Sequence, residues 1–108
     1  MSNLDETIWE LVDALAKQSQ CSKRQVGCVI YNTKLDEIVG KGFNMHLNGV
    51  CDCHSTKTAT HAEVIALNDI LKPSKREDLV LFVSHAPCKA CKSVIEKEVY
   101  EVRYRSQH

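Results

Sequence analysis

The sequence has no excess of charge of either sign, because fourteen Lys and Arg residues balance fourteen Asp and Glu residues. A protein that binds a long nucleic acid needs a positively charged groove along the phosphate backbone. Short basic pairs such as Lys23-Arg24 and Lys75-Arg76 do not form such a groove, although one of them could hold a single phosphate. We therefore expect no long nucleic-acid partner.

Long apolar runs are also missing, and the first residues do not show a basic segment followed by an apolar one. A membrane-spanning helix needs about 20 apolar residues in a row, and a secretory signal needs that order of segments. We therefore expect a cytoplasmic protein without a membrane partner. The six cysteines of such a chain are better explained by metal ligation than by disulfides.

Linkers, internal repeats and low-complexity segments are absent as well, and 108 residues fit a single domain over residues 1–108. Periodicity predicts helices at residues 4–19, from 61 to before Pro73, and from Pro87 onward. The predicted strands are Val26–Tyr31, Glu37–Phe43, Leu79–Val83 and Glu101–Tyr104. This order predicts a layered α/β fold.

Two details of the first two strands are informative. Residues 32–34 have turn chemistry, so these strands should form a hairpin. Gly40 and Gly42 predict a bulge or the close approach of another group. Cys28 lies in an apolar strand and is expected to be a small core residue.

Three side chains that can bind a metal ion stand in two short motifs, His61 in the first and Cys88 with Cys91 in the second. Zinc binds imidazole nitrogen and thiolate sulfur tetrahedrally, and a catalytic site keeps the fourth position open. Cys88 and Cys91 are three residues apart, so they share one face of a helical turn, and the positive end of that helix favours their thiolate forms. We expect these three residues to hold a catalytic zinc ion.

Glu63 follows His61 by two residues, so we expect it beside the metal and not among its ligands. Zinc lowers the pKa of bound water, and a neighbouring carboxylate can take the proton and deliver it to a leaving amine. Three ligands, one open position and one acid suit hydrolytic deamination, with Glu63 as the catalytic residue.

Each of these residues also has an ordinary structural explanation. Thr60 and Glu63 have the spacing of a capping box, so Glu63 could simply cap a helix. Cys88 and Cys91 alone could be a redox pair or half of a structural zinc site, and His61 alone could be a hydrogen-bonded polar residue. Their joint occurrence at two predicted helix starts favours catalysis.

The two motifs, His61-Ala62-Glu63 and Pro87-Cys88-Lys89-Ala90-Cys91, have the H-x-E and P-C-x-x-C forms of zinc deaminases. With them the chain resembles the cytidine deaminase superfamily, and within it the deoxycytidylate (dCMP) deaminases. The similarity extends over about residues 5–104. It includes Cys21-Ser22-Lys23-Arg24-Gln25-Val26-Gly27, Gly42-Phe43-Asn44 and Ser84-His85-Ala86.

The resemblance implies a three-layer α/β/α sandwich with a mixed central sheet, zinc between two helix N-termini, and a homo-oligomer. It implies that Asn44 contacts the sugar or base of a pyrimidine nucleotide, and that the backbone of Ala62 and Ser84 reads the base. Lys23 or Arg24 could meet the phosphate, but solvation explains them equally well. Family members usually continue past the last predicted strand, so we expect a fold shortened at its C-terminus, with a sheet edge that a partner subunit could cover.

A second, structural zinc site is predicted from Cys21, Cys51, Cys53 and His54. Three of them crowd into residues 45–60, which show no periodicity and are long for a loop in a small domain. Closed sites with four N and S ligands order such segments, and some dCMP deaminases carry a comparable zinc near these positions. Cys51 and Cys53 are only two residues apart, so one of them alone could bind. The alternative is free thiols beside a polar histidine.

The expected function is therefore zinc-dependent hydrolysis of dCMP to dUMP and ammonia. Alternative substrates are cytidine, deoxycytidine, free cytosine or a modified cytosine, and a polynucleotide, which the neutral charge disfavours. A zinc-stapled interaction module without catalysis is an alternative of a different class. It would need a fourth protein ligand, and His85 is the nearest candidate.

Overall fold

The computed structural model describes residues 3–19, 25–46, 59–87 and 89–106. Its helices are α1 (Asn3–Gln18), α2 (Ala62–Asn68), α3 (Lys89–Glu98) and a short 3₁₀ helix, η1 (Arg76–Asp78). Its strands are β1 (Gly27–Asn32), β2 (Glu37–Phe43), β3 (Met45–His46), β4 (Ala59–Thr60), β5 (Leu79–His85) and β6 (Glu101–Ser106). Along the described chain, no helix combines the length and apolar character needed to cross a membrane.

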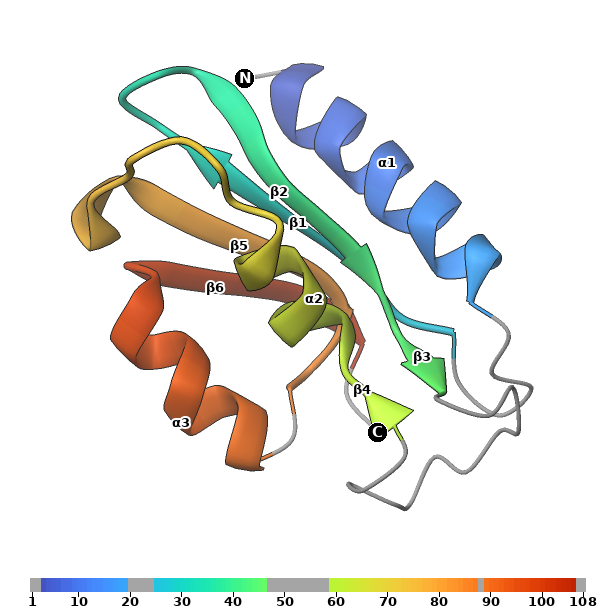
Figure 1. Ribbon diagram of the computed structural model, residues 1–108. Helices are drawn as coiled ribbons and strands as arrows, with labels where there is room; N and C mark the ends of the chain where they lie inside the picture. Colours follow the sequence, from blue (N-terminus) through green and yellow to red (C-terminus); the bar gives the residue numbers. More distant parts are fainter. Residues whose placement is uncertain (1–2, 20–24, 47–58, 88, 107–108) are drawn as a thin grey trace.

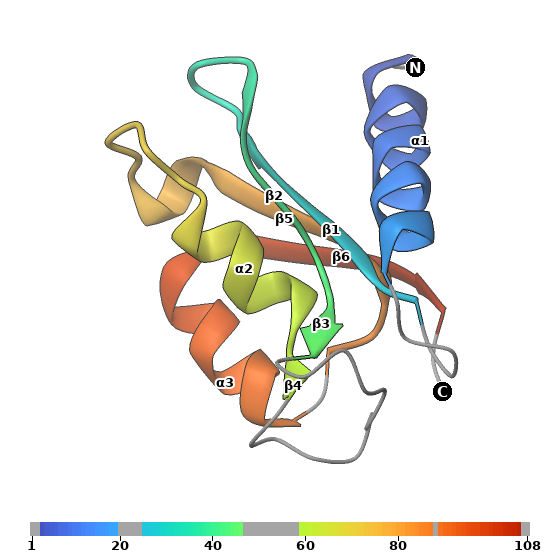
Figure 2. The same ribbon diagram turned by 45° about the vertical axis from the view of Figure 1, so that its right-hand side comes forward.

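Four strands form the central sheet in the order β2-β1-β5-β6 (Figure 1). β1 runs antiparallel to both β2 and β5, and β5 runs parallel to β6, so the sheet is mixed. Helix α1 lies on one face, and α2 and α3 lie on the other (Figure 2). The predicted three-layer α/β/α sandwich is confirmed.

The hairpin of β1 and β2 forms as predicted, and its turn is held by a buried side chain. The Oδ1 atom of Asn32 accepts hydrogen bonds from the backbone N–H groups of Lys34 and Leu35, each at 2.9 Å. The pairing register shifts between Ile30 and Tyr31, because Val39 of β2 is an extra residue; this is the irregularity predicted in the strand that contains Gly40.

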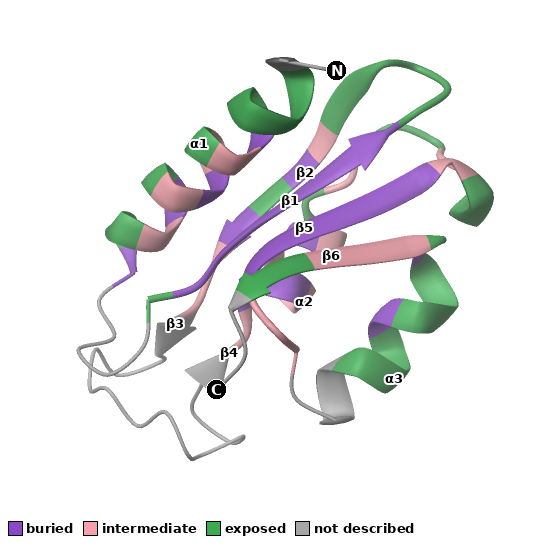
Figure 3. Cartoon of the chain, turned by 180° about the vertical axis from the view of Figure 1, so that it is seen from behind, coloured by how far each residue is buried: buried purple, intermediate pink, exposed green. Residues whose placement is uncertain are grey.

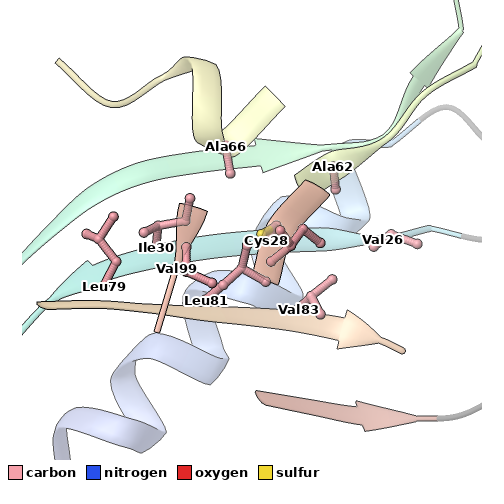
Figure 4. Packing of buried hydrophobic residues seen from close by; sticks show 10 residues of the cluster. Val26, Cys28, Ile30, Ala62, Ala66, Leu79, Leu81, Val83 and Val99 are labelled. Atoms are coloured by element: carbon pink, nitrogen blue, oxygen red, sulfur yellow. The ribbon is translucent and has the colours of Figure 1, made fainter. Parts of the chain in front are cut away.

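Apolar side chains fill both gaps between layers, and Figure 3 shows buried residues along β1 and β5 and on parts of the helices. On the α1 face, the helix stripe packs on the sheet, and the rings of Trp9 and Phe82 meet edge to face at 5.3 Å. On the opposite face, Cys28 is fully buried among residues of β1, α2, β5 and α3 (Figure 4). The expectation that Cys28 belongs to the core is confirmed, and β5 is buried on both faces as its apolar run predicted.

Candidate active site

One end of the sheet collects most of the described residues predicted to act in catalysis or binding. Because β1 is antiparallel to its two neighbours, its first residues lie beside the last residues of β2 and β5. Asn44 follows β2 directly, and Ser84 is near the end of β5. The first turns of α2 and α3 lie at this same end, close to β4 (Figures 1 and 2).

A short ladder of β3 and β4 joins two of these positions. Met45 pairs with Thr60, and His46 pairs with Ala59. Asn44 precedes this ladder and His61 follows it, so the pairing brings the two residues to the same place although sixteen residues separate them in sequence. The ladder falls within the segment that was expected to lack regular structure, because strands of two residues are too short to show a pattern.

Glu63 lies in the first turn of α2 and is 4 % exposed. Burial raises the pKa of its carboxyl above the ordinary value, while a hydrogen bond with its own backbone and the charge of His61 act in the opposite direction. The helix begins one residue later than a capping box requires: His61 is the N-cap and Glu63 is the second helical residue. The interpretation of Glu63 as the third residue of a Thr60-capped box is therefore wrong.

The raised pKa predicts a pH dependence of stability for the metal-free protein. Between the ordinary pKa and the raised one, folded Glu63 keeps a proton that the unfolded chain releases. The folded state then binds more protons, so the free energy of unfolding falls as pH rises through that window. Denaturant melts of the metal-free protein from about pH 4 to 7 should show a flatter profile for Glu63→Gln than for the wild type. Identical profiles would contradict a raised pKa.

Asn44 and Ser84 are held by the first residues of the central strand. Oδ1 of Asn44 accepts a hydrogen bond from the N–H of Val26 at 3.0 Å, and its own N–H donates to the carbonyl of Val26 at 3.2 Å. The Oγ atom of buried Ser84 accepts from the N–H of Gly27 at 3.1 Å and lies 3.2 Å from Nδ1 of His85. These anchors at Val26 and Gly27 were not predicted. The sequence offered one signal for them, which is that a glycine, Gly27, begins an apolar strand.

The bond from Val26 also fixes the orientation of the Asn44 amide. Its oxygen faces Val26, the residue before β1, so the donor group Nδ2 is the other end of this amide. The side chain predicted to contact a sugar or base is thus set in place before any ligand arrives.

The predicted zinc ligands are described only in part. His61 is half-buried at the start of α2, and the backbone of Cys91 belongs to the first turn of α3. The side chain of Cys91 and the whole of Cys88 lie outside the described residues. Six other predicted site residues also lie wholly outside the described residues: Cys21, Lys23, Arg24, Cys51, Cys53 and His54.

Among the side chains that are described, no group of three His, Cys, Asp or Glu comes together as a metal site. The pair of His61 and Glu63 fits a zinc centre in its chemistry, because an imidazole stands beside a buried acid at a helix start. A second helix start, carrying Cys91, lies at the same end of the sheet. Both the catalytic and the structural ligand sets stay predictions.

Known proteins resemble this chain over nearly its whole length. The family model for the cytidine and deoxycytidylate deaminase zinc-binding region matches residues 2–104. A deoxycytidylate deaminase of Schizosaccharomyces pombe is 24 % identical over 122 residues, which cover 96 % of this chain and 37 % of that protein. The chain thus spans little more than a third of the length of this curated relative.

Solved structures of a dCMP deaminase from the cyanophage S-TIM5 share the fold. The apo form has a TM-score of 0.82 and 25 % identity, and the match covers 99 % of this chain and 86 % of that one. The complex with dCMP and dUMP has a TM-score of 0.79 and 24 % identity, with 100 % and 85 % covered. On the strength of the family match, the chain belongs to the cytidine and deoxycytidylate deaminase zinc-binding family.

Proposed function

We propose that this protein is a zinc-dependent deaminase that hydrolyses dCMP to dUMP and ammonia. The observation that carries the proposal is the burial of Glu63 directly beside His61, at the helix start where the family motif lies. Membership of the family supports the reaction. The S-TIM5 deaminase, which was solved with dCMP and dUMP, supports the choice of a nucleotide substrate.

His61, Cys88 and Cys91 would hold the catalytic zinc, because one nitrogen and two sulfur donors leave one position open. When bound, zinc supplies a Lewis acid that makes water a better nucleophile at neutral pH. The positive end of α3 would favour the thiolate form of its cysteine ligands.

Glu63 moves the proton in this reaction. The bond between C4 and the exocyclic nitrogen of cytosine breaks, and oxygen from water takes the place of the amine. The carboxylate of Glu63 accepts a proton from the attacking water and donates it to the departing nitrogen, which leaves as ammonia, while the second proton of water ends on N3 of the uracil ring. In the metal-free protein, burial raises the pKa of this carboxyl, which brings its titration closer to neutral pH.

The remaining site residues would orient the substrate. Asn44 would donate from its amide to the sugar or base, and the backbone of Ala62 and Ser84 would read the pyrimidine edge. Asn44 and Ser84 each accept a hydrogen bond from the backbone at the start of β1, so both side chains would be held in place for the substrate. Lys23 or Arg24 would meet the phosphate.

Ammonia release from cytosine, cytidine, deoxycytidine, CMP and dCMP tests the proposed substrate. We expect kcat/KM for dCMP to exceed that for deoxycytidine by at least about 100-fold, because a charge-assisted phosphate contact left unmade costs a few kcal/mol. If the enzyme preferred a nucleoside or the free base, that compound would replace dCMP as the proposed substrate. No release from any of them would reject the proposed function.

The number of zinc ions tests the structural site formed by Cys21, Cys51, Cys53 and His54. Elemental analysis of the purified protein should find about two zinc ions per chain if both sites fill. Cys51→Ser with Cys53→Ser should lower the count to about one and leave the catalytic ion in place. A wild-type count of one would remove the second site. The single-domain organisation, the homo-oligomer and the cytoplasmic location stay predictions.

A further inference from the structure

Three residues form a row across the sheet beneath the first turn of α2. Cys28 of β1 pairs with Gly42 of β2 on one side and with Val83 of β5 on the other. Paired residues of neighbouring strands face the same side of a sheet. Cys28 and Val83 belong to the core on the side of α2 and α3, together with Ala62, the first residue of α2 (Figure 4).

Gly42 allows the helix to lie unusually close to the sheet. A Cβ atom at this position would lie 2.7 Å from the carbonyl oxygen of Ala62 and 2.8 Å from the backbone nitrogen of Ala66. Both contacts are shorter than real Cβ contacts, and both atoms are backbone, so a side chain could fit only if the helix moved. The missing side chain therefore determines how deeply the first turn of α2 sits.

Cys28 lies next to Gly42 in this row and has no exposed surface. Burial raises the pKa of its thiol well above the ordinary value, and the charge of Glu63 raises it further. Cys28 is small, and it packs in the same core cluster as Ala62, the first residue of the turn that carries Glu63. A larger side chain there would push on the first turn of α2.

We propose that Gly42 and Cys28 form the floor of the active site and act as positioning residues. Their small size sets how close His61 and Glu63 lie to the sheet. This role deepens the proposed function and rests on it. Gly42 sets the distance between the sheet and the backbone of α2, and Cys28 sets the space beneath the first turn of that helix. Neither residue takes part in proton transfer.

Gly42→Ala tests this role, with Gly40→Ala as the matched control. A Cβ at Gly40 would lie 2.4 Å from the carbonyl oxygen of Ala66, so it strains the same helix at least as severely, but toward the opposite end from His61. We expect Gly42→Ala to lower kcat about 10- to 100-fold more than the control does, because a small displacement of a reacting group lowers the reaction rate strongly. KM should change less than kcat, since Asn44 and Ser84 are held by β1.

Substitutions of Cys28 give a second test that does not depend on Gly42→Ala being folded. Cys28→Ala keeps the side chain small and should retain kcat within about threefold, whereas Cys28→Val should lower it about tenfold or more. Equal kcat values for Gly42→Ala and Gly40→Ala, measured on equal amounts of folded protein, would overturn the proposal. Equal values for Cys28→Val and Cys28→Ala would do the same.

Cobalt binding separates this proposal from the proposed function. Titration of metal-free protein with Co²⁺, followed by visible absorption, should show affinity about 10- to 100-fold weaker in Gly42→Ala than in Gly40→Ala, because His61 moves with the turn. If the wild type releases no ammonia in the substrate screen, the proposed function fails and this titration alone decides the role of the floor. If the wild type is active and the two variants bind cobalt equally, only the floor is rejected.

Discussion

Glu63→Gln is expected to lower kcat for dCMP by about 10²- to 10⁴-fold. The substitution keeps the size and most of the hydrogen bonding of the side chain, but an amide can neither accept the proton of water nor donate it to the leaving amine. Glu63 is buried, so bulk buffer cannot easily take over this role. Ammonia release measures the loss, and elemental analysis should find the zinc content unchanged.

Glu98→Gln is the matched control for this experiment, because it makes the same chemical change at an exposed position of α3. It should leave kcat within about twofold of the wild type, as surface substitutions usually do. Glu63→Ala should also abolish turnover while zinc stays bound. Near-normal turnover in either Glu63 variant would show that another group transfers the proton.

Removal of the catalytic metal has the largest expected effect. His61→Ala should lose the catalytic zinc, and turnover should fall by at least about 10⁶-fold, toward the uncatalysed rate. The melting temperature should fall as well, because an ion that binds only the folded chain stabilises it. Zinc content, ammonia release and thermal melts measure these changes, and treatment of the wild type with a chelator should reproduce them.

His85→Ala distinguishes a catalytic zinc from a structural one in the same experiment. His85 is half-buried at the end of β5, with Nδ1 3.2 Å from Ser84 Oγ. If the zinc has three protein ligands and an open position, His85→Ala should keep the metal. Loss of zinc from both His61→Ala and His85→Ala would instead indicate a closed four-ligand site and favour the non-catalytic interaction module.

The sequence predicted the larger elements of the fold because each contains several repeats of one period. The stripe of Ile8, Val12 and Leu15 marks α1, and the apolar run of β5 marks a strand buried on both faces. The ladder of β3 and β4 has only two residues per strand and shows no period. Pro73 set only a limit for the end of α2. The helix stops at Asn68, before the proline that was expected to bound it.

The active site was predictable only as far as it is local in sequence. The spacing of His61 and Glu63 predicted a metal ligand and an acid, but it did not reveal that the helix begins at Ala62 and excludes the capping box. The floor depends on the register that places Cys28 beside Gly42, and on the contact of both with α2. Strand register and contacts between a strand and a helix involve separate elements, so no motif within a single element could predict the floor.

The ladder of β3 and β4 has a consequence for how this site can diversify. Because Asn44 and His61 each adjoin one of its strands, four paired residues hold them in register whatever the chain does between residues 47 and 58. Lengthening such a segment costs little, since closure entropy grows only with the logarithm of loop length. Changes in the length of that segment should therefore leave Asn44 and His61 in the same relative position.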